Sequence, residues 1–181
     1  WDVMAVAPAA VGNGGSLTYP GTGDYVYAFQ GGTTNSFWRY SISGDSWDTS
    51  LAVAPSTVGH GGALTALNSN ILYGMQGAAY RGFWEYNIST GAWTTKASTP
   101  ANVSAGGSLT TDGTNVYATQ GNSTTFWRYN VATNDWSTLT AAPVSIGGTS
   151  ARGGISYSSS LNSIFMIPGI GKALKNIDIP D

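Results

Sequence analysis

The sequence carries few side chains that could perform catalysis. It has no cysteine and a single histidine, His60, and Glu85 is its only glutamate. A Ser-His-Asp site would have to use His60, but no Gly-x-Ser-x-Gly turn accompanies this histidine. Glycoside hydrolysis needs two carboxylates about 5 to 10 Å apart, whereas most aspartates fall in predicted turns, where they cap backbone N–H groups. We therefore expect a protein that is not an enzyme and has no catalytic residue.

The same scarcity argues against a bound metal or cofactor. A chain without cysteine cannot form a thiolate site, and a copper site would need several imidazole ligands. We expect no metal ligands and no cofactor.

The charge pattern excludes several classes of partner. Seven basic and nine acidic side chains give a net charge of -2, and only 9% of residues are charged. Because no basic run supplies the attraction that drives most nucleic-acid binding, we expect no nucleic-acid partner. No stretch approaches the roughly 18 apolar residues of a membrane span, so membrane insertion is not expected either. Low charge with abundant Gly, Ser and Thr is typical of secreted surface proteins and predicts an extracellular or cell-surface location.

Four tryptophans divide the chain into four similar units. They are 46, 46 and 43 residues apart, which indicates an internal repeat. We interpret residues 1–181 as one domain built from repeats of about 1–47, 48–93, 94–136 and 137–181. The repeating tryptophans are Trp1, Trp47, Trp93 and Trp136.

Each unit presents the same order of segments. A glycine pair opens an alternating stretch, an apolar run ending in glycine follows, and three units continue with the pattern Phe-Trp-x-Tyr, at residues 37–40, 83–86 and 126–129. The turn residues between these segments predict four short strands per unit. A single sheet of this kind would expose apolar faces, so neighbouring units must cover each other, as they do in a β-propeller.

The order of these segments resembles the kelch repeat. Residues 26–32 match its second strand and glycine pair, residues 37–40 its aromatic third strand, and Trp47 its outer-strand tryptophan. The resemblance covers essentially the whole chain. It implies an all-β fold, a propeller of four kelch-like four-stranded blades, of the secreted bacterial or archaeal surface type. The fourth unit departs from the pattern because it lacks the Phe-Trp-x-Tyr segment.

The ends of the chain predict how the propeller closes. The fourth unit has no terminal tryptophan, whereas Trp1 stands without a preceding unit, and counting from Trp136 past Asp181 to Trp1 restores the period of 46. We therefore predict that residues 1–7 form the outer strand of the last blade, beside a degenerate third strand at residues 173–177. The strand could come from the same chain, giving a closed monomer, or from a neighbouring subunit, giving an oligomer or filament. A third arrangement is a segment of a longer repeat array.

The aromatic residues are expected to form the core. Adjacent residues on a strand point to opposite faces, so Phe37 and Trp38 should serve two different layers between blades. The residues predicted to form the repeat core are Trp1, Trp38, Trp47, Trp93, Trp127 and Trp136. A competing interpretation leaves some aromatics exposed to stack on sugar rings. The candidates for glycan stacking are Tyr80, Trp84 and Tyr157.

Two further sets of residues are candidate sites. By analogy with kelch propellers, the residues before each glycine pair should lie on the innermost strands and line the central channel. These channel-lining candidates are Asn13, His60, Ala105 and Arg152. Three Asn-x-Ser/Thr sequences could accept glycans in a suitable host. These glycosylation candidates are Asn87, Asn102 and Asn122.

The sequence favours a non-enzymatic extracellular module with a structural or adhesive role. The terminal strand that could be exchanged makes the chain itself the expected partner, in a homo-oligomer or a filament. The alternative is a carbohydrate-binding, lectin-like propeller that uses exposed aromatics, with glycans or cell-surface proteins as partners.

Overall fold

The computed structural model consists of β-strands and connecting turns throughout the residues it describes, which are 1–148, 153–169 and 174–179. The strands form four antiparallel sheets, one from each repeat. The inner strands are β1 (Ser16–Thr18), β5 (Ala63–Ala66), β9 (Ser108–Thr111) and β13 (Gly154–Ser158). The second strands are β2 (Tyr25–Phe29), β6 (Ile71–Met75), β10 (Asn115–Thr119) and β14 (Ser163–Ile167). The third strands are β3 (Phe37–Ser41), β7 (Phe83–Asn87), β11 (Phe126–Asn130) and β15 (Lys175–Asp178). The outer strands are β4 (Ser46–Asp48), β8 (Ala92–Thr95) and β12 (Asp135–Thr138).

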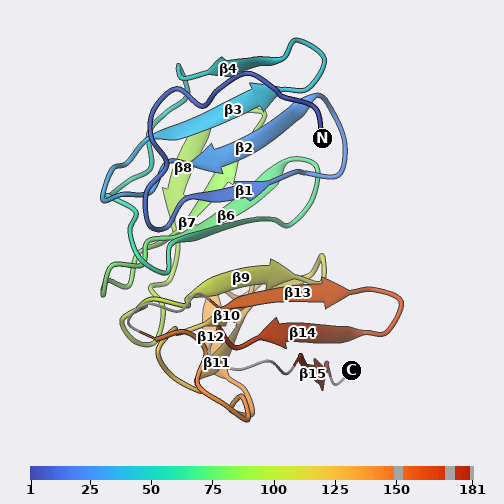
Figure 1. The fold of residues 1–181 in the computed structure, drawn as a ribbon. Coiled ribbons are helices and arrows are strands. Elements are labelled where there is room, and N and C mark those ends of the chain that lie inside the picture. Colours follow the sequence, from blue (N-terminus) through green and yellow to red (C-terminus); the bar gives the residue numbers. More distant parts are fainter. Residues whose placement is uncertain (149–152, 170–173, 180–181) are drawn as a thin grey trace.

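The four sheets are the blades of a β-propeller, which confirms the predicted fold class. We number the sheets blades 1 to 4 in chain order. Within each blade the strands pair in sequence order from inside to outside. The inner strands carry the contacts between blades: β1 lies beside β5 and β5 beside β9. Figure 1 shows β9 beside β13. Among the described residues, the strands of blade 1 and blade 4 share no extensive contact.

The glycine pairs allow the blades to approach closely at the axis. Gly14, Gly61 and Gly106 all have positive φ, between 80° and 91°. A Cβ atom on Gly14 would lie 2.1 Å from the carbonyl oxygen of Gly59 in the next repeat, and one on Gly61 would lie 2.0 Å from that of Ser104. Any side chain here would both strain the backbone and force the blades apart, which explains why the sequence repeats glycine at this point.

The core lies in layers between successive blades. The layer between blades 1 and 2 includes Tyr27, Phe29 and Phe37 from blade 1, packed against Trp84 and Tyr86 of blade 2. Trp38 points to the other side of blade 1, where its ring contacts that of Trp47 at 6.1 Å. Phe37 and Trp38 therefore serve opposite faces, as the alternation of a strand requires.

The last blade differs from the prediction, because its described residues form three strands. Residues 1–7 of the same chain do not pair with β15, and Trp1 is fully exposed rather than part of the core. The N-terminal segment is instead held on blade 1, where the Ala5 N–H donates to Asp45 Oδ1 at 2.6 Å and the Trp47 indole N–H donates to the Ala5 carbonyl at 3.0 Å. These bonds place the N-terminal segment on blade 1 rather than on blade 4.

The predicted degenerate third strand is present as β15. It pairs with β14, with Ile177 opposite Ile164. Of the predicted residues 173–177, position 173 lies outside the described residues.

Among the described residues, no helix is long and apolar enough to cross a membrane.

Candidate functional site

Three of the four channel-lining candidates lie around one cavity at the centre of the propeller. Asn13, His60 and Ala105 line a space of about 200 Å³, together with the backbone of the glycine pairs. Asn13 Nδ2 and His60 Nε2 are 3.2 Å apart and form a hydrogen bond. The cavity thus offers an amide, an imidazole and glycine backbone groups, a surface suited to hydrogen bonding rather than to apolar contact.

Two details of this site differ from the sequence prediction. Asn13, His60 and Ala105 occupy the turns that precede the inner strands, not the strands themselves. The fourth repeat is also offset by one residue, because a Cβ on Gly153 would meet Ile146 as a Cβ on Gly107 would meet Val103. Gly153 therefore corresponds to the second glycine of each pair. Arg152, the fourth candidate, lies outside the described residues.

Asp24 and Asp112 hold turns through hydrogen bonds to their carboxylates. Asp24 accepts hydrogen bonds from the Ser41 hydroxyl and the Ser43 N–H, which lower its pKa. Burial raises the pKa of Asp112, but hydrogen bonds from the Asn115 and Thr114 N–H groups and the Tyr117 hydroxyl outweigh this effect and lower it overall. Within the described residues no group of three His, Asp or Glu side chains is arranged to hold a metal ion.

One repeated position carries a charge between the blades. Arg39 forms an ion pair with Asp48 at 2.9 Å and lies over the Tyr25 ring at 4.3 Å. Glu85, at the same position in blade 2, pairs with Lys96 at 3.1 Å and accepts a hydrogen bond from the Tyr73 hydroxyl at 2.6 Å. Desolvation, with the hydrogen bond to Glu85, raises the pKa of Tyr73 strongly.

Arg128 is the third residue at this position, and its environment is less complete. Its Nε is buried and makes no hydrogen bond within the described residues. The side chain lines a cavity of about 360 Å³ between blades 3 and 4, together with Tyr117, Leu139 and Ile177.

The glycan-stacking candidates are not brought together. Tyr80 is exposed, in the loop between β6 and β7. Trp84 is buried in the layer between blades 1 and 2, so the prediction of an exposed ring at this position is wrong. Tyr157 is half-buried against the layer between blades 3 and 4, and its hydroxyl donates to Asn162 at 3.2 Å. Of the three glycan-stacking candidates, Tyr80 is the one whose side chain is exposed.

The glycosylation candidates differ in accessibility. Asn102 and Asn122 are exposed in loops. Asn87 is half-buried at the end of β7, where its side-chain oxygen accepts a hydrogen bond from the Thr90 N–H at 3.1 Å.

The remaining predicted core tryptophans lie where the repeat requires them. Trp38 and Trp127 are buried. Trp47, Trp93 and Trp136 are half-buried on the outer strands.

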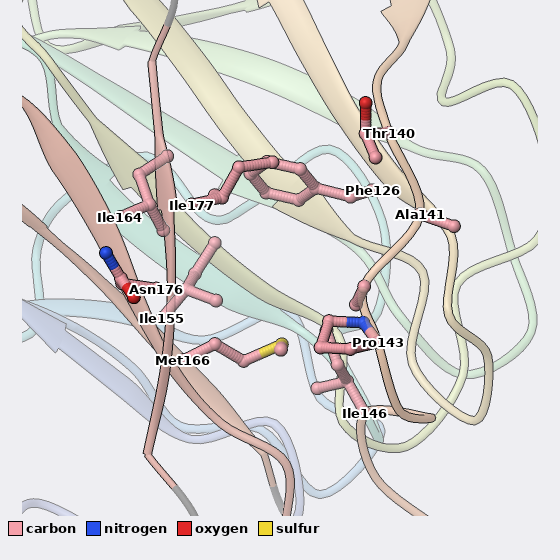
Figure 2. A pocket seen from close by; sticks show the side chains of 11 residues that line it. Phe126, Thr140, Ala141, Pro143, Ile146, Ile155, Ile164, Met166, Asn176 and Ile177 are labelled. Carbon is pink, nitrogen blue, oxygen red and sulfur yellow. The ribbon is translucent and has the colours of Figure 1, made fainter.

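A second, apolar cavity lies between blades 3 and 4, and we call it the blade-4 cavity. It has a volume of about 210 Å³. Figure 2 shows Phe126 of blade 3 at its centre, with Ile177 and Met166 of blade 4 on one side and Thr140 and Ala141 of the connecting segment on the other. Its full lining is Phe126, Thr140, Ala141, Ala142, Pro143, Ile146, Ile155, Ile164, Met166, Asn176 and Ile177. Sequence reasoning missed this cavity, although the missing tryptophan of the fourth unit was the signal for it.

Comparison with known proteins supports the fold. No known protein family and no curated protein matches the sequence. Among solved structures, that of YjhT is similar, with a TM-score of 0.68 and 13% sequence identity over 97% of this chain and 68% of that one. At this level of identity the likeness defines the class of protein, a β-propeller, and nothing more specific.

Proposed function

We propose that this chain is a non-enzymatic, extracellular structural or adhesive propeller module, of kelch-like type, that assembles with other copies of itself. The observation that carries the proposal is the state of the two terminal blades. Each one exposes apolar residues that the other blades bury, and the two exposed faces correspond to the two sides of the interfaces already present within the chain.

The exposed face of blade 1 is the one that, in blades 2 and 3, packs against the preceding blade. Leu17 is 65% exposed, whereas Leu64 and Leu109, at the same position in blades 2 and 3, are 5% and 7% exposed. These two leucines pack into the layers against blades 1 and 2. Leu17 has no equivalent layer and faces solvent.

The exposed face of blade 4 corresponds to the opposite side. Ile167 is 59% exposed, whereas its equivalents Phe29 and Met75 are almost fully buried against the following blade. Leu174 precedes β15 at the position that Phe37 occupies in blade 1, and it is 61% exposed. The exposed face of blade 4 is therefore apolar, like the exposed face of blade 1, and the two faces correspond to the two sides of an interface between successive blades.

The chemistry of the described side chains supports a non-enzymatic role. His60 is exposed and hydrogen-bonded to an amide, and the carboxylates described above are engaged by turns or ion pairs. Low charge together with abundant Gly, Ser and Thr supports the proposed extracellular location.

The experiment is a measurement of assembly as a function of concentration. Light scattering coupled to size-exclusion chromatography, followed by electron microscopy, should show oligomeric rings or filaments that dissociate on dilution. A matched pair of variants sharpens the result: Leu17→Asp should weaken assembly, whereas Leu161→Asp, at an exposed leucine in the turn between β13 and β14, should not. A chain that stays monomeric at millimolar concentration would overturn the proposed assembly.

A further inference from the structure

The outer-strand tryptophan of blade 2 shows what normally fills the space between two blades. The Trp93 ring lies 4.9 Å from Phe37 of blade 1 and 4.9 Å from Tyr86 of its own blade, measured between ring centroids. Its indole N–H donates to the carbonyl of Ala52 at 3.0 Å, in the segment that connects blade 1 to blade 2. The tryptophan thus closes the layer at its outer edge.

Trp136 of blade 3 makes the same set of contacts with blade 2. Its ring lies 4.8 Å from Phe83 and 5.1 Å from Tyr129, and its N–H donates to the Ala97 carbonyl at 2.8 Å. Two copies of the repeat therefore define the same tryptophan site. The site consists of a Phe from the preceding blade, a residue that pairs with the tryptophan on the third strand of its own blade, and a backbone carbonyl of the connecting segment that accepts the indole N–H.

The blade-4 cavity contains each part of this tryptophan site, but no tryptophan lines it. Phe126 is the counterpart of Phe37 and Phe83, because each begins the third strand of its blade. Ile177 is the counterpart of Tyr86 and Tyr129, because it pairs with Ile164 as they pair with Leu72 and Val116. Both Phe126 and Ile177 line the cavity.

Backbone hydrogen bonds identify the acceptor carbonyl. The Leu139 N–H donates to the Phe126 carbonyl as the Lys96 N–H donates to that of Phe83. Thr140, the residue after Leu139, therefore corresponds to Ala97, whose carbonyl accepts the Trp136 indole. Thr140 also lines the blade-4 cavity, so the position of the acceptor is present as well.

The size of the cavity suits an aromatic ring. An apolar cavity of roughly 150 Å³ can hold benzene, and the blade-4 cavity measures about 210 Å³. Filling it with an aromatic side chain would bury roughly 150 to 250 Å² of that side chain.

Trp1 has the position in the repeat of the tryptophan that would occupy this site. It precedes Ala5 by the four residues that separate Trp93 from Ala97, and the Ala5 and Ala97 carbonyls both accept an indole N–H from the next blade. Trp1 is fully exposed in this structure. Because Ala5 is fixed on blade 1, and Figure 1 shows the N-terminus and β15 at opposite ends of the molecule, Trp1 cannot reach the blade-4 cavity of its own chain without a large rearrangement.

We propose that the blade-4 cavity of one copy binds Trp1 of a second copy, with residues 1–3 of that copy added to the free edge of β15 as its fourth strand. Ile177 would then stand opposite Trp1, as Tyr86 stands opposite Trp93. The same placement brings the exposed face of blade 4 against that of blade 1, so the contact repeats the packing between blades within the chain. This inference rests on the proposed self-assembly and names the partner and the residues that make it. Such a head-to-tail contact gives a ring if the rotation closes and a filament if it does not.

The test uses a peptide of residues 1–7 and the methionine methyl groups of the full chain. Met166 lines the blade-4 cavity, whereas Met75 is buried between blades 2 and 3 and serves as an internal reference. Adding the peptide to the chain carrying Trp1→Ala should shift the methyl resonance of Met166 and leave that of Met75 unchanged. The same peptide with alanine in place of Trp1 should produce no shift.

Two substitutions in the full chain complete the test. Trp1→Ala should weaken self-association at least tenfold, and Ala141→Trp, which fills the cavity from within, should do the same and also abolish the peptide-induced shift. Ala132→Trp, in the turn before β12, is the matched control and should change neither. Because Trp1 is exposed, its removal should not affect folding.

The outcomes separate this inference from the proposed function. If Trp1→Ala and Ala141→Trp assemble as the unchanged chain does, the proposed contact is overturned and the proposed self-assembly stands. If the unchanged chain does not assemble, self-assembly is overturned, and the peptide then decides whether the cavity accepts the Trp1 segment. A peptide that leaves Met166 unshifted overturns binding in the cavity whatever the oligomeric state.

Discussion

The interface between blades 2 and 3 and the interface between blades 3 and 4 are built from the same repeat but differ in completeness. In the first, Trp136 on the outer strand packs against Phe83 and closes the layer. In the second, the described residues of blade 4 form three strands, and the equivalent space around Phe126 is the blade-4 cavity. The outer strand therefore has two roles. It forms the edge of its own sheet, and its tryptophan fills the outer part of the layer between its blade and the preceding blade.

The charged position shows the same contrast. Glu85 of blade 2 has both an ion-pair partner and a hydroxyl donor, whereas Arg128 of blade 3 has a buried Nε with no hydrogen bond among the described residues. Both residues face the following blade. The layer that lacks a tryptophan is therefore also the one with an incompletely satisfied polar group.

The largest effect should come from removing an aromatic residue from a complete layer. Trp127→Ala deletes a side chain that is 1% exposed in the layer between blades 2 and 3. We expect a loss of about 3 to 5 kcal/mol in the free energy of unfolding, because the cavity left behind cannot collapse fully. Urea unfolding followed by circular dichroism would measure it.

Trp1→Ala is the control for that experiment. Measured on the monomer, it should change the unfolding free energy by less than about 0.5 kcal/mol, because an exposed side chain loses no buried surface. Equal losses for the two variants would contradict the assignment of Trp127 to the core and of Trp1 to the surface.

A pair of leucines at one repeat position tests the exposed face of blade 1. Leu109→Ala should cost about 2 to 4 kcal/mol, because Leu109 is buried against blade 2. Leu17→Ala should cost less than about 0.5 kcal/mol in the monomer. Thermal and urea unfolding at low protein concentration would show whether the two differ. A large loss for Leu17→Ala would mean that the face of blade 1 is covered within a single chain.

The ion pair at Glu85 should contribute a smaller amount. Glu85→Gln removes the charge that pairs with Lys96 and weakens the hydrogen bond from the Tyr73 hydroxyl. We expect a loss of about 1 to 2 kcal/mol. Lys96→Met, which leaves the Tyr73 hydrogen bond in place, should cost less than Glu85→Gln, and the reverse order would contradict the importance of that bond.

The smallest effect concerns the attachment of the N-terminal segment. The Tyr40 hydroxyl and the Ala5 N–H both donate to Asp45, and these bonds lower its pKa. A carboxyl with a lowered pKa stabilises the folded state above its unfolded pKa, and the stabilisation is lost as the pH falls through the folded value. The Ala5 amide should therefore exchange faster with solvent in acid, relative to an unbonded reference amide.

Asp45→Asn provides the control for the acid dependence. Without a titrating group at this position, the relative protection of the Ala5 amide should no longer change with pH. A pH dependence that persists in Asp45→Asn would assign the effect to another group.

The sequence predicted the fold better than it predicted the sites. The four repeats, the strand order and the opposite orientation of Phe37 and Trp38 follow from local patterns, and the structure agrees with them. The prediction that Trp84 stacks on sugars failed because alternation tells which face of a strand a residue occupies but not whether another blade covers that face. Asn13 and His60 were proposed to lie beside the central channel by analogy with kelch propellers, and in the structure both line one cavity, from turns rather than from strands.

Sequence alone determined the number of units, their strands and the glycines at the axis, because these depend on backbone geometry and on periods of two residues. Only the tertiary structure decided where residues 1–7 lie and that a cavity is left between blades 3 and 4 by the residues the structure describes. The physical reason is that residues 1–7 could pair either with blade 1 or with the edge of blade 4, and local sequence patterns do not distinguish the two. In this structure the hydrogen bonds of Ala5 hold that segment on blade 1.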